Sequence, residues 1–371
     1  AQQISFIKDY NVNNRNSGAL VIRQTPDKGY ILGGESAAGW FDTDYTLLKT
    51  DSLGNMQWYH HFGEETNSVR SICILPDTSY IITGFTNYNE YMTFEEQAAL
   101  IKYNNQGDTI WYKTYGKIFN EDSTYDYTSD AFRDAIYTKD SCILAVGWSE
   151  SYTQYTNSSL PYIVKTDTAG NIIWQWVWPD DIDFTYRNEA GLGSVVETSE
   201  GDYVIFGGTN NHLEGMDKYP NGYMGLIIKI SSEGELLWYR EWDKIWDVRA
   251  ENIVEHKDGS FYFCGKLPMR CPDYDVDSCD QAISFIAHVD SDGRNIDYKI
   301  IDYAYDTYIQ NIVLDNNFLT AFYVVTPYKD WEIWKTDVYI EKYDITNGYD
   351  LLWSRTIGTD SIQDRLEDAV I

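Results

Sequence analysis

The chain has 371 residues, of which 43% are hydrophobic and 16% aromatic, and its 28 basic and 58 acidic residues give a net charge of −30 at pH 7. This charge repels nucleic acid phosphates and anionic membrane surfaces, so we expect neither a nucleic acid partner nor membrane insertion. The sequence also lacks an apolar run of about 18 residues, the minimum for a membrane-spanning helix.

The main feature of the sequence is a block of about 55–65 residues that recurs six times, a period typical of repeat proteins. One copy contains the segments 29–34 (GYILGG), 47–55 (LLKTDSLGN) and 58–59 (WY). Repeat units of this kind bury their faces against one another, so we interpret residues 1–371 as one domain. The copies span approximately residues 18–63, 68–116, 131–178, 192–243, 249–302 and 309–358.

Each copy is predicted to contain four strands, which in the second copy are residues 70–75, 80–85, 98–103 and 109–115. These runs are short, rich in Ile, Val, Tyr and Trp, and bounded by turn residues. No segment has the sustained 3.6-residue apolar period of a helix. The sequence therefore predicts an all-β fold, a β-propeller of four-stranded antiparallel blades.

Three positions recur within the copies. The second strand carries a small residue at Gly33, Gly84, Gly147, Gly207, Gly265 and Ala321. The fourth strand carries an aromatic residue at Trp58, Trp111, Trp174, Trp238, Tyr298 and Trp353, and we interpret its tryptophans as core between blades. The third strand carries a lysine that His288 replaces in the fifth copy, where we expect a structural role.

The two ends of the chain continue the repeat pattern. Residues 4–10 (ISFIKDY) match a fourth strand, and residues 364–371 (DRLEDAVI) match the start of a first strand. A seventh blade built from both ends would remove exposed sheet edges, so we favour seven blades, with six as the alternative. Because that blade lacks two strands, we expect the natural chain to continue past Ile371 by at least about 30 residues.

The chain start and the cysteines indicate a secreted protein. Residues 1–3 (AQQ) include no Met, as after removal of a signal peptide or at an engineered start. Cys73, Cys142 and Cys264 lie within predicted strands and are expected to be small buried hydrophobes. Cys271 and Cys279 flank one loop, and we predict a disulfide between them.

Loop lengths differ between the two ends of the predicted blades. One end has short, uniform turns, whereas the other has long, irregular loops, which in repeat proteins mark the binding face. These loops are rich in aromatic residues, which suit a sugar ring or a protein surface, although the rings would also serve to pack the loops onto the blades. The predicted binding residues are Trp40, Phe41, Tyr88, Tyr91, Tyr152, Tyr155, His212, Tyr219, Trp331 and Trp334.

One loop is the strongest metal candidate. Its alternating carboxylates, Asp273, Asp275, Asp277 and Asp280, offer the oxygen ligands that Ca²⁺ prefers. The match to a calcium-binding loop is incomplete, because Ser278 stands where glycine is needed and no glutamate follows. We expect no other cofactor.

Motifs for catalysis are absent from the sequence. It contains no Gly-x-Ser-x-Gly, no Gly-Lys-Ser/Thr phosphate loop and no His-Glu-x-x-His. His60 and His61 are adjacent in a strand and point to opposite faces, so they do not chelate one metal ion. We therefore assign no catalytic residue, while carboxylate pairs for glycoside cleavage stay open because 58 acidic residues always offer pairs.

The segments 29–34, 48–55 and 172–175 (IIWQ) resemble the repeats of secreted bacterial β-propeller proteins, which are common in the Bacteroidota. Such chains often carry a C-terminal sorting domain for type IX secretion, and no such domain is visible here. The resemblance implies a secreted or outer-surface location and a role in attachment, with no catalytic residues to carry over.

These observations favour a non-catalytic binding or assembly protein that contacts a glycan or a secreted or cell-surface protein through its long-loop face. The alternative is a polysaccharide-active enzyme, a glycoside hydrolase or lyase, with its site on the same face. An enzyme requires carboxylates, or tyrosine and histidine, that converge on one site.

Overall fold

The computed structural model describes sixteen segments of the chain: residues 8, 10, 16–39, 42–62, 67–87, 96–117, 129–152, 158–178, 190–209, 224–246, 249–268, 282–301, 306–326, 337–346, 348–357 and 368. In these residues no helix is long and apolar enough to cross a membrane. The 24 strands found in the described residues all belong to four-stranded antiparallel sheets, and the strands of each sheet follow chain order. The predicted all-β propeller of four-stranded antiparallel blades is confirmed.

The number of blades corrects the sequence interpretation. The described residues form six blades, which was the alternative, and not the favoured seven. Of the two terminal segments only Lys8, Tyr10 and Asp368 are described, and none of the three lies in a strand. The alternating pattern of residues 4–10 and 364–371 is compatible with a strand, but a blade also requires hydrogen-bonded neighbours.

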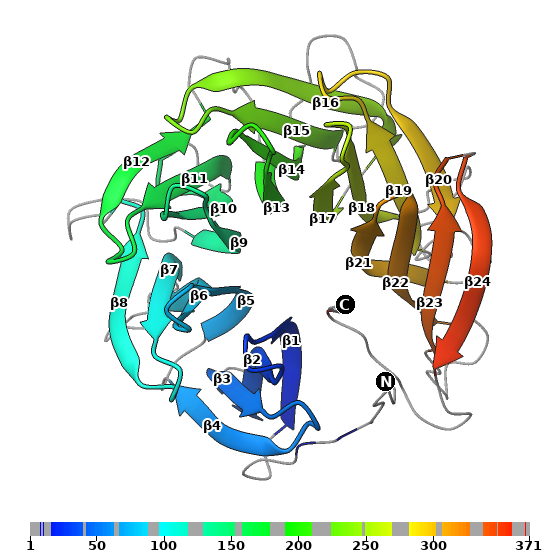
Figure 1. Cartoon of the computed structure of the whole chain (residues 1–371). Coiled ribbons are helices and arrows are strands. Elements are labelled where there is room, and N and C mark those ends of the chain that lie inside the picture. Colours follow the sequence, from blue (N-terminus) through cyan, green and yellow to red (C-terminus); the bar gives the residue numbers. More distant parts are fainter. Residues whose placement is uncertain are drawn as a thin grey trace. The chain divides into compact units, whose positions relative to one another are not determined.

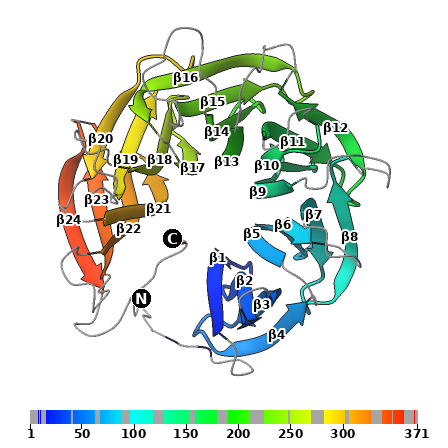
Figure 2. The ribbon, with the colours of Figure 1, turned by 180° about the vertical axis from the view of Figure 1, so that it is seen from behind.

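The chain divides into two compact units, residues 1–187 with residue 370, and residues 188–369 with residue 371. The first unit holds blades 1, 2 and 3, in which the first strand of each sheet is innermost and the fourth is outermost (Figures 1 and 2). Its strands are β1 (Asn16–Gln24), β2 (Tyr30–Gly39), β3 (Asp42–Thr50), β4 (Met56–Phe62), β5 (Asn67–Ile74), β6 (Tyr80–Asn87), β7 (Glu96–Tyr103), β8 (Thr109–Tyr115), β9 (Asp130–Tyr137), β10 (Ile143–Ser149), β11 (Leu160–Thr166) and β12 (Ile172–Val177).

The second unit holds blades 4, 5 and 6, with the same order of strands in each sheet. Its strands are β13 (Ala190–Glu197), β14 (Tyr203–Thr209), β15 (Met224–Ile230), β16 (Leu236–Trp246), β17 (Arg249–Glu255), β18 (Phe261–Pro268), β19 (Ala282–Val289), β20 (Asp297–Ile301), β21 (Asp306–Asp315), β22 (Phe318–Thr326), β23 (Asp337–Asp344) and β24 (Asp350–Ile357).

The turns between third and fourth strands form because a polar side chain and a glycine meet there; the polar residue is Asp or Asn in blades 1, 2, 3 and 5 and Ser231 in blade 4. In blade 1, Asp51 Oδ1 accepts hydrogen bonds from the backbone N–H groups of Leu53 and Asn55, both at 2.8 Å. Gly54 adopts a φ of 72°, a conformation that glycine tolerates without steric cost. The Asp167 turn of blade 3 repeats these contacts. The Asp-x-x-Gly pattern therefore determines the turn locally.

In blades 1 to 4 a bulge in the neighbouring first strand requires a glycine in the second strand. A Cβ at Gly84 would lie 1.9 Å from the carbonyl oxygen of Ser68, and Gly147 and Gly207 face equivalent oxygens. The register corrects two of the predicted positions. Gly34, not Gly33, pairs with the residue before the bulge in blade 1, and in blade 6 that partner is Tyr323 instead of Ala321.

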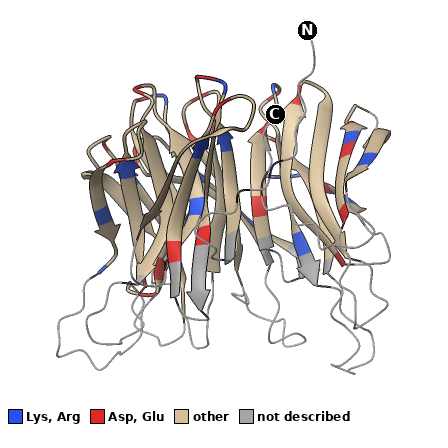
Figure 3. Cartoon of the chain, turned by 90° about the horizontal axis from the view of Figure 1, so that it is seen from below, with Lys and Arg blue, Asp and Glu red and all other residues tan. Residues whose placement is uncertain are grey.

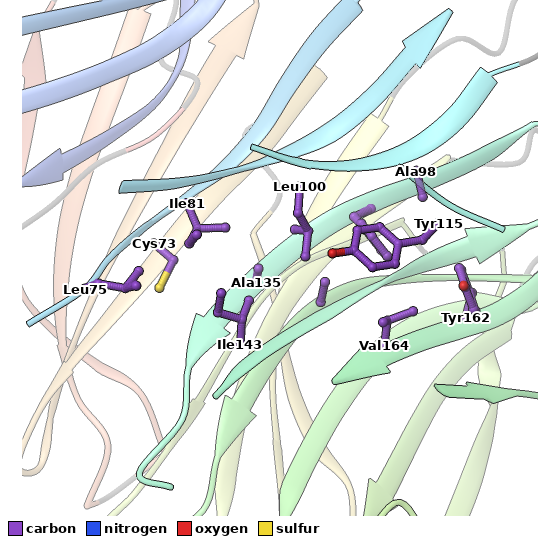
Figure 4. Close-up of a cluster of buried hydrophobic side chains, with 12 residues drawn as sticks. Cys73, Leu75, Ile81, Ala98, Leu100, Tyr115, Ala135, Ile143, Tyr162 and Val164 are labelled. Carbon is purple, nitrogen blue, oxygen red and sulfur yellow. The ribbon is translucent and has the colours of Figure 1, made fainter. Parts of the chain in front are cut away.

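The hydrophobic core of each unit lies between neighbouring sheets. The cluster between blades 2 and 3 contains Leu100 and Tyr115 from one sheet and Ile143, Tyr162 and Val164 from the other (Figure 4). Similar clusters join blades 1 and 2, blades 4 and 5, and blades 5 and 6. Of the expected core tryptophans, those at 58, 111, 174 and 238 are half-buried, whereas Trp353 is exposed.

A lysine in the third strand anchors the turn between the first and second strands of blades 1 to 4, and it is buried in blades 1 to 3. The Lys49 ammonium lies 2.9 Å from Asp27 and the Lys165 ammonium lies 2.6 Å from Asp140, and Lys102 pairs with Asp77 in the same way. In blade 4 the half-buried Lys229 lies 3.2 Å from Asp202, at the end of the turn. Figure 3 shows charges of both signs at these turn ends of the strands. Burial raises the pKa of Asp27, but hydrogen bonds from Thr25, Lys49 and Gly29 outweigh it and lower this pKa to about 2.

Blade 5 replaces this ion pair with aromatic packing. His288 occupies the lysine position, with its ring centroid 4.6 Å from that of Tyr262. Asp258 instead has His256 Nδ1 at 2.8 Å. The register also corrects the predicted position of the aromatic residue in the fourth strand. In the other blades the tryptophan of the fourth strand pairs with the lysine of the third, but in blade 5 it is Asp297 that pairs with His288. Tyr298 instead packs on Trp242 of blade 4.

Restoring the lysine is predicted to change the pH dependence of stability. Burial lowers the pKa of His288 below its usual value of about 6.5, although Asp258, Asp297 and Asp290 oppose this and His256 adds to it. The unfolded state then binds the proton more readily, so the stability that neutral His288 contributes is lost as the pH falls from about 7 to about 5. In His288→Lys the cation is charged throughout this range and faces Asp258 and Asp297.

The measurement is the free energy of unfolding by denaturant at both pH values. We expect it to fall less on acidification in His288→Lys than in the unsubstituted protein. His288→Gln, which carries no titrating group, is the control and should also lose this pH dependence. An unchanged pH dependence in both variants would contradict the assignment to His288.

Candidate functional site

The described part of the predicted binding face consists of the strand ends that border the long loops, which we call the loop ends. Tyr152 is the one predicted binding residue within the described residues. The other nine, Trp40, Phe41, Tyr88, Tyr91, Tyr155, His212, Tyr219, Trp331 and Trp334, lie outside them. So do the predicted metal ligands Asp273, Asp275, Asp277 and Asp280, and the predicted disulfide partners Cys271 and Cys279.

A buried carboxylate organises the loop end of blade 3. Asp130, the first residue of β9, is only 2% exposed. Its Oδ1 accepts hydrogen bonds from the Ser149 hydroxyl and from the backbone N–H groups of Glu150 and Ser151, at 3.1 and 3.2 Å. Burial raises the pKa of Asp130, and these hydrogen bonds oppose the shift because they favour the charged form. The carboxylate therefore ties the start of the inner strand to the end of β10.

The end of blade 2 closes onto the same carboxylate. Gly116, directly after β8, has a φ of +126°, and a Cβ there would lie 2.0 Å from Asp130 Oδ2. The next residue, Lys117, donates its backbone N–H to the Ser151 hydroxyl at 2.9 Å. A residue without a side chain is thus needed where the outer strand of blade 2 passes the inner strand of blade 3.

Two further carboxylates flank Ser129, the residue before β9. The Ser129 hydroxyl donates to Glu96 Oε2 of blade 2 at 2.6 Å, and the Ser129 N–H donates to Glu150 Oε2 at 3.1 Å. Both glutamates are partly exposed. Together Glu96, Ser129, Asp130 and Glu150, with Lys117, form what we call the carboxylate cluster, which spans the loop ends of blades 2 and 3.

Tyr152 lies beside this cluster and serves as a packing residue. It is half-buried, with its ring centroid 5.5 Å from that of Tyr162, and its hydroxyl accepts a hydrogen bond from Gln175 at 3.0 Å. The exposed Lys117 ammonium lies over the Tyr152 ring, 4.6 Å from its centroid. The ring of Tyr152, the residue next to Ser151 in the sequence, thus holds the Lys117 cation.

A carboxylate–imidazole pair lies at the loop end of blade 1. His61 Nε2 is 2.5 Å from Asp44 Oδ2, with side-chain exposures of 31% for the histidine and 2% for the aspartate. A buried carboxylate that orients a partly exposed imidazole is an arrangement used for proton transfer. The neighbouring His60 turns to the other face and contacts the Gln106 carbonyl oxygen of blade 2 at 3.2 Å.

The described residues contain no group of three or more His, Cys, Asp and Glu side chains arranged to hold a metal ion. Cys73 and Cys264 are buried free thiols and Cys142 is half-buried. Burial raises the pKa of Cys73 to about 12, so this thiol stays protonated at neutral pH.

Sequence reasoning missed both polar groups at the loop ends. Asp44, Glu96 and Asp130 each lie at the start of a strand that follows a long loop, which is a signal available in the sequence. Their partners come from other strands, and Glu96 and Glu150 even come from different blades. The spacing of these residues along the chain therefore could not predict which side chains meet.

The fold is similar to solved structures at very low sequence identity. A polysaccharide lyase described as an ulvan lyase, solved with a -[GlcA(1-4)Rha3S]- ligand, has 8% identity and a TM-score of 0.56, with 91% of this chain and 84% of that chain covered. A second polysaccharide lyase has 11% identity and a TM-score of 0.51, with 89% and 78% covered. These likenesses show the fold alone.

A member of the DUF4221 family from Bacteroides vulgatus has 12% identity, with 84% of this chain and 89% of that chain covered, and its TM-score of 0.43 is too low to carry an argument. No family model matches the chain, and no curated protein matches its sequence.

Replacing Gly116 is predicted to disrupt the carboxylate cluster. In Gly116→Ala the methyl group clashes with Asp130 Oδ2 and the backbone is strained, so we expect a loss of about 2–4 kcal/mol in the free energy of unfolding. Gly201→Ala is the matched control, because Gly201 also has a positive φ, +93°, but no atom lies within 4 Å of its Cβ position. Denaturant titration measures both, and equal losses would mean that Asp130 does not require the glycine.

Proposed function

We propose that this protein binds a glycan through the loop ends of blades 2 and 3, with the carboxylate cluster as its polar centre. The observation that carries the proposal is that two partly exposed carboxylates, Glu96 and Glu150, both accept hydrogen bonds from Ser129. The buried Asp130 follows Ser129 in the chain and is linked through Ser151 to the backbone of the exposed Lys117. Carboxylates accept strong hydrogen bonds from sugar hydroxyl groups, and an ammonium donates to them. These groups lie on strand ends held by hydrogen bonds, so little ordering is needed on binding.

The surroundings of the cluster in the sequence agree with this function. The segments 118–128 and 153–157, which follow β8 and Tyr152, carry the aromatic residues Phe119, Tyr125, Tyr127 and Tyr155. Aromatic faces next to polar groups suit sugar rings. The likeness of the fold to two polysaccharide lyases adds support, because both of those proteins act on polysaccharides.

Our second candidate function is polysaccharide cleavage, and the pair of His61 and Asp44 favours it. An imidazole that is partly exposed and oriented by a buried carboxylate suits a general base or acid. Asp44 would orient the His61 imidazole. In both cases we place the protein outside the cell or on its outer surface, an assignment that rests on the sequence.

Glycan binding is tested by calorimetry against a panel of neutral and anionic polysaccharides. We expect Glu96→Gln combined with Glu150→Gln to weaken binding about tenfold or more, because hydrogen bonds to charged groups contribute about 1.5–3 kcal/mol each. Glu255→Gln is the matched control, since Glu255 also holds a serine, Ser199, but at a turn end. Binding that survives the double substitution unchanged would refute the site.

Cleavage is tested with the polysaccharides that bind. Hydrolysis produces new reducing ends, and elimination produces an unsaturated sugar that absorbs in the ultraviolet. If the protein is an enzyme, His61→Ala should lower the rate about 10²–10⁴-fold, the usual contribution of a general acid or base, with binding retained. Binding without either product would assign the non-catalytic function.

A further inference from the structure

The outer strands of neighbouring blades carry a row of side chains that docks on the next blade. In β8 this row is Trp111, Lys113 and Tyr115, which lie on one face of the strand. The Trp111 indole N–H donates to the Thr168 carbonyl at 3.3 Å, the Lys113 ammonium to Asn171 Oδ1 at 2.8 Å, and the Tyr115 hydroxyl to the Gly170 carbonyl at 3.0 Å. All three acceptors belong to the Asp167–Asn171 turn of blade 3.

The same contact recurs in other blades. In β4 the Trp58 indole N–H donates to the Asn105 carbonyl at 3.1 Å, and in β16 the Arg240 guanidinium donates to the Asp292 carbonyl at 3.0 Å. In three blades the tryptophan ring covers the glycine of the neighbouring turn. A Cβ would lie 3.1 Å from Trp58 at Gly107, 3.0 Å from Trp111 at Gly170 and 2.6 Å from Trp238 at Gly293. The row therefore recognises an Asx-x-x-Gly turn.

Residues outside any described blade make these contacts too. The Lys8 ammonium donates to Asn55 Oδ1 at 2.6 Å, and the Tyr10 hydroxyl donates to the Gly54 carbonyl at 2.7 Å. These are the contacts of Lys113 and Tyr115, with the same two-residue spacing, on the turn of blade 1. The interaction thus forms between a turn and residues that belong to none of the six sheets.

In β24 the row is present, and no turn among the described residues contacts it. Trp353 pairs with Lys342, as Trp111 pairs with Lys102, so the row of β24 is Trp353, Arg355 and Ile357. Every residue of β24 is exposed, with 45% of Trp353 open to solvent. Within the part of the chain that the structure describes, none of these three side chains has a hydrogen-bond, ion-pair or ring partner.

We propose that the row of β24 is a docking surface for a β-hairpin that another polypeptide contributes, with an Asx-x-x-Gly turn at its tip. The Trp353 ring covers the glycine of this turn, and Arg355 donates to a turn carbonyl, as Arg240 does. Ile357 packs where Tyr115 and Trp242 are buried on other outer strands. We expect an Asx-x-x-Gly turn in the partner because turns of this kind contact the equivalent rows of β4, β8 and β16.

The probe for this surface is a peptide of residues 160–177, β11 and β12 with their turn, closed into a ring because an isolated hairpin is only marginally stable. Calorimetry measures its binding to the full chain. We expect Trp353→Ala to weaken binding about tenfold or more, as expected for a buried tryptophan anchor, and Arg355→Ala to weaken it less. A peptide with Gly170→Val should not bind, because its side chain meets the tryptophan ring.

Leu352→Ala is the matched control, because Leu352 is equally exposed but lies on the opposite face of β24. Circular dichroism confirms that each variant is folded. The proposal is overturned if the peptide does not bind, if Leu352→Ala weakens binding as much as Trp353→Ala, or if the Gly170→Val peptide binds equally well.

Discussion

The packing of each four-stranded sheet on the next is the interaction on which the rest of the structure depends. A sheet of this size does not bury enough apolar surface alone, and the four core clusters accordingly lie between neighbouring sheets. Close packing also excludes side chains at particular positions. The bulged inner strand leaves no room for a side chain at Gly84 and Gly147, and the outer-strand tryptophans leave none at Gly107 and Gly170. Gly84 and Gly147 thus allow close approach of two strands within one sheet, whereas Gly107 and Gly170 allow the outer strand of one blade to approach the turn of the next.

The two ends of a blade have different tasks. At the turn ends, the lysine–aspartate pairs recur in blades 1 to 3 and anchor a turn within each blade, and the Asx-x-x-Gly turns recur and receive the outer strand of the neighbouring blade. At the loop ends, each blade has its own polar groups: the pair of Asp44 and His61 in blade 1, and the carboxylate cluster in blades 2 and 3. A scaffold fixed at one end allows the other end to differ, and differing groups are what recognition of a specific ligand requires.

The sequence predicted the elements well where a local interaction decides them. The Asp51 and Asp167 turns form through hydrogen bonds within five residues, so their pattern is sufficient. It predicted the role of a residue less well where the pairing register of two strands decides that role. A slip of one residue in a strand changes the face on which a side chain lies, and this separates Gly34 from Gly33 and Asp297 from Tyr298. The number of blades was wrong for a related reason, because alternation does not reveal which strands are hydrogen-bonded.

By itself the sequence determined the repeat, the four strands of each blade and the tight turns. It also determined that each blade has a uniform turn end and a variable loop end. All of these follow from neighbouring residues. The tertiary structure decided what stands together at the variable end. Glu96 and Glu150 lie 54 positions apart in the sequence and belong to different sheets, yet both bind Ser129. Only the packing of blade 2 on blade 3 brings them together, since no local interaction connects residues so distant in the chain.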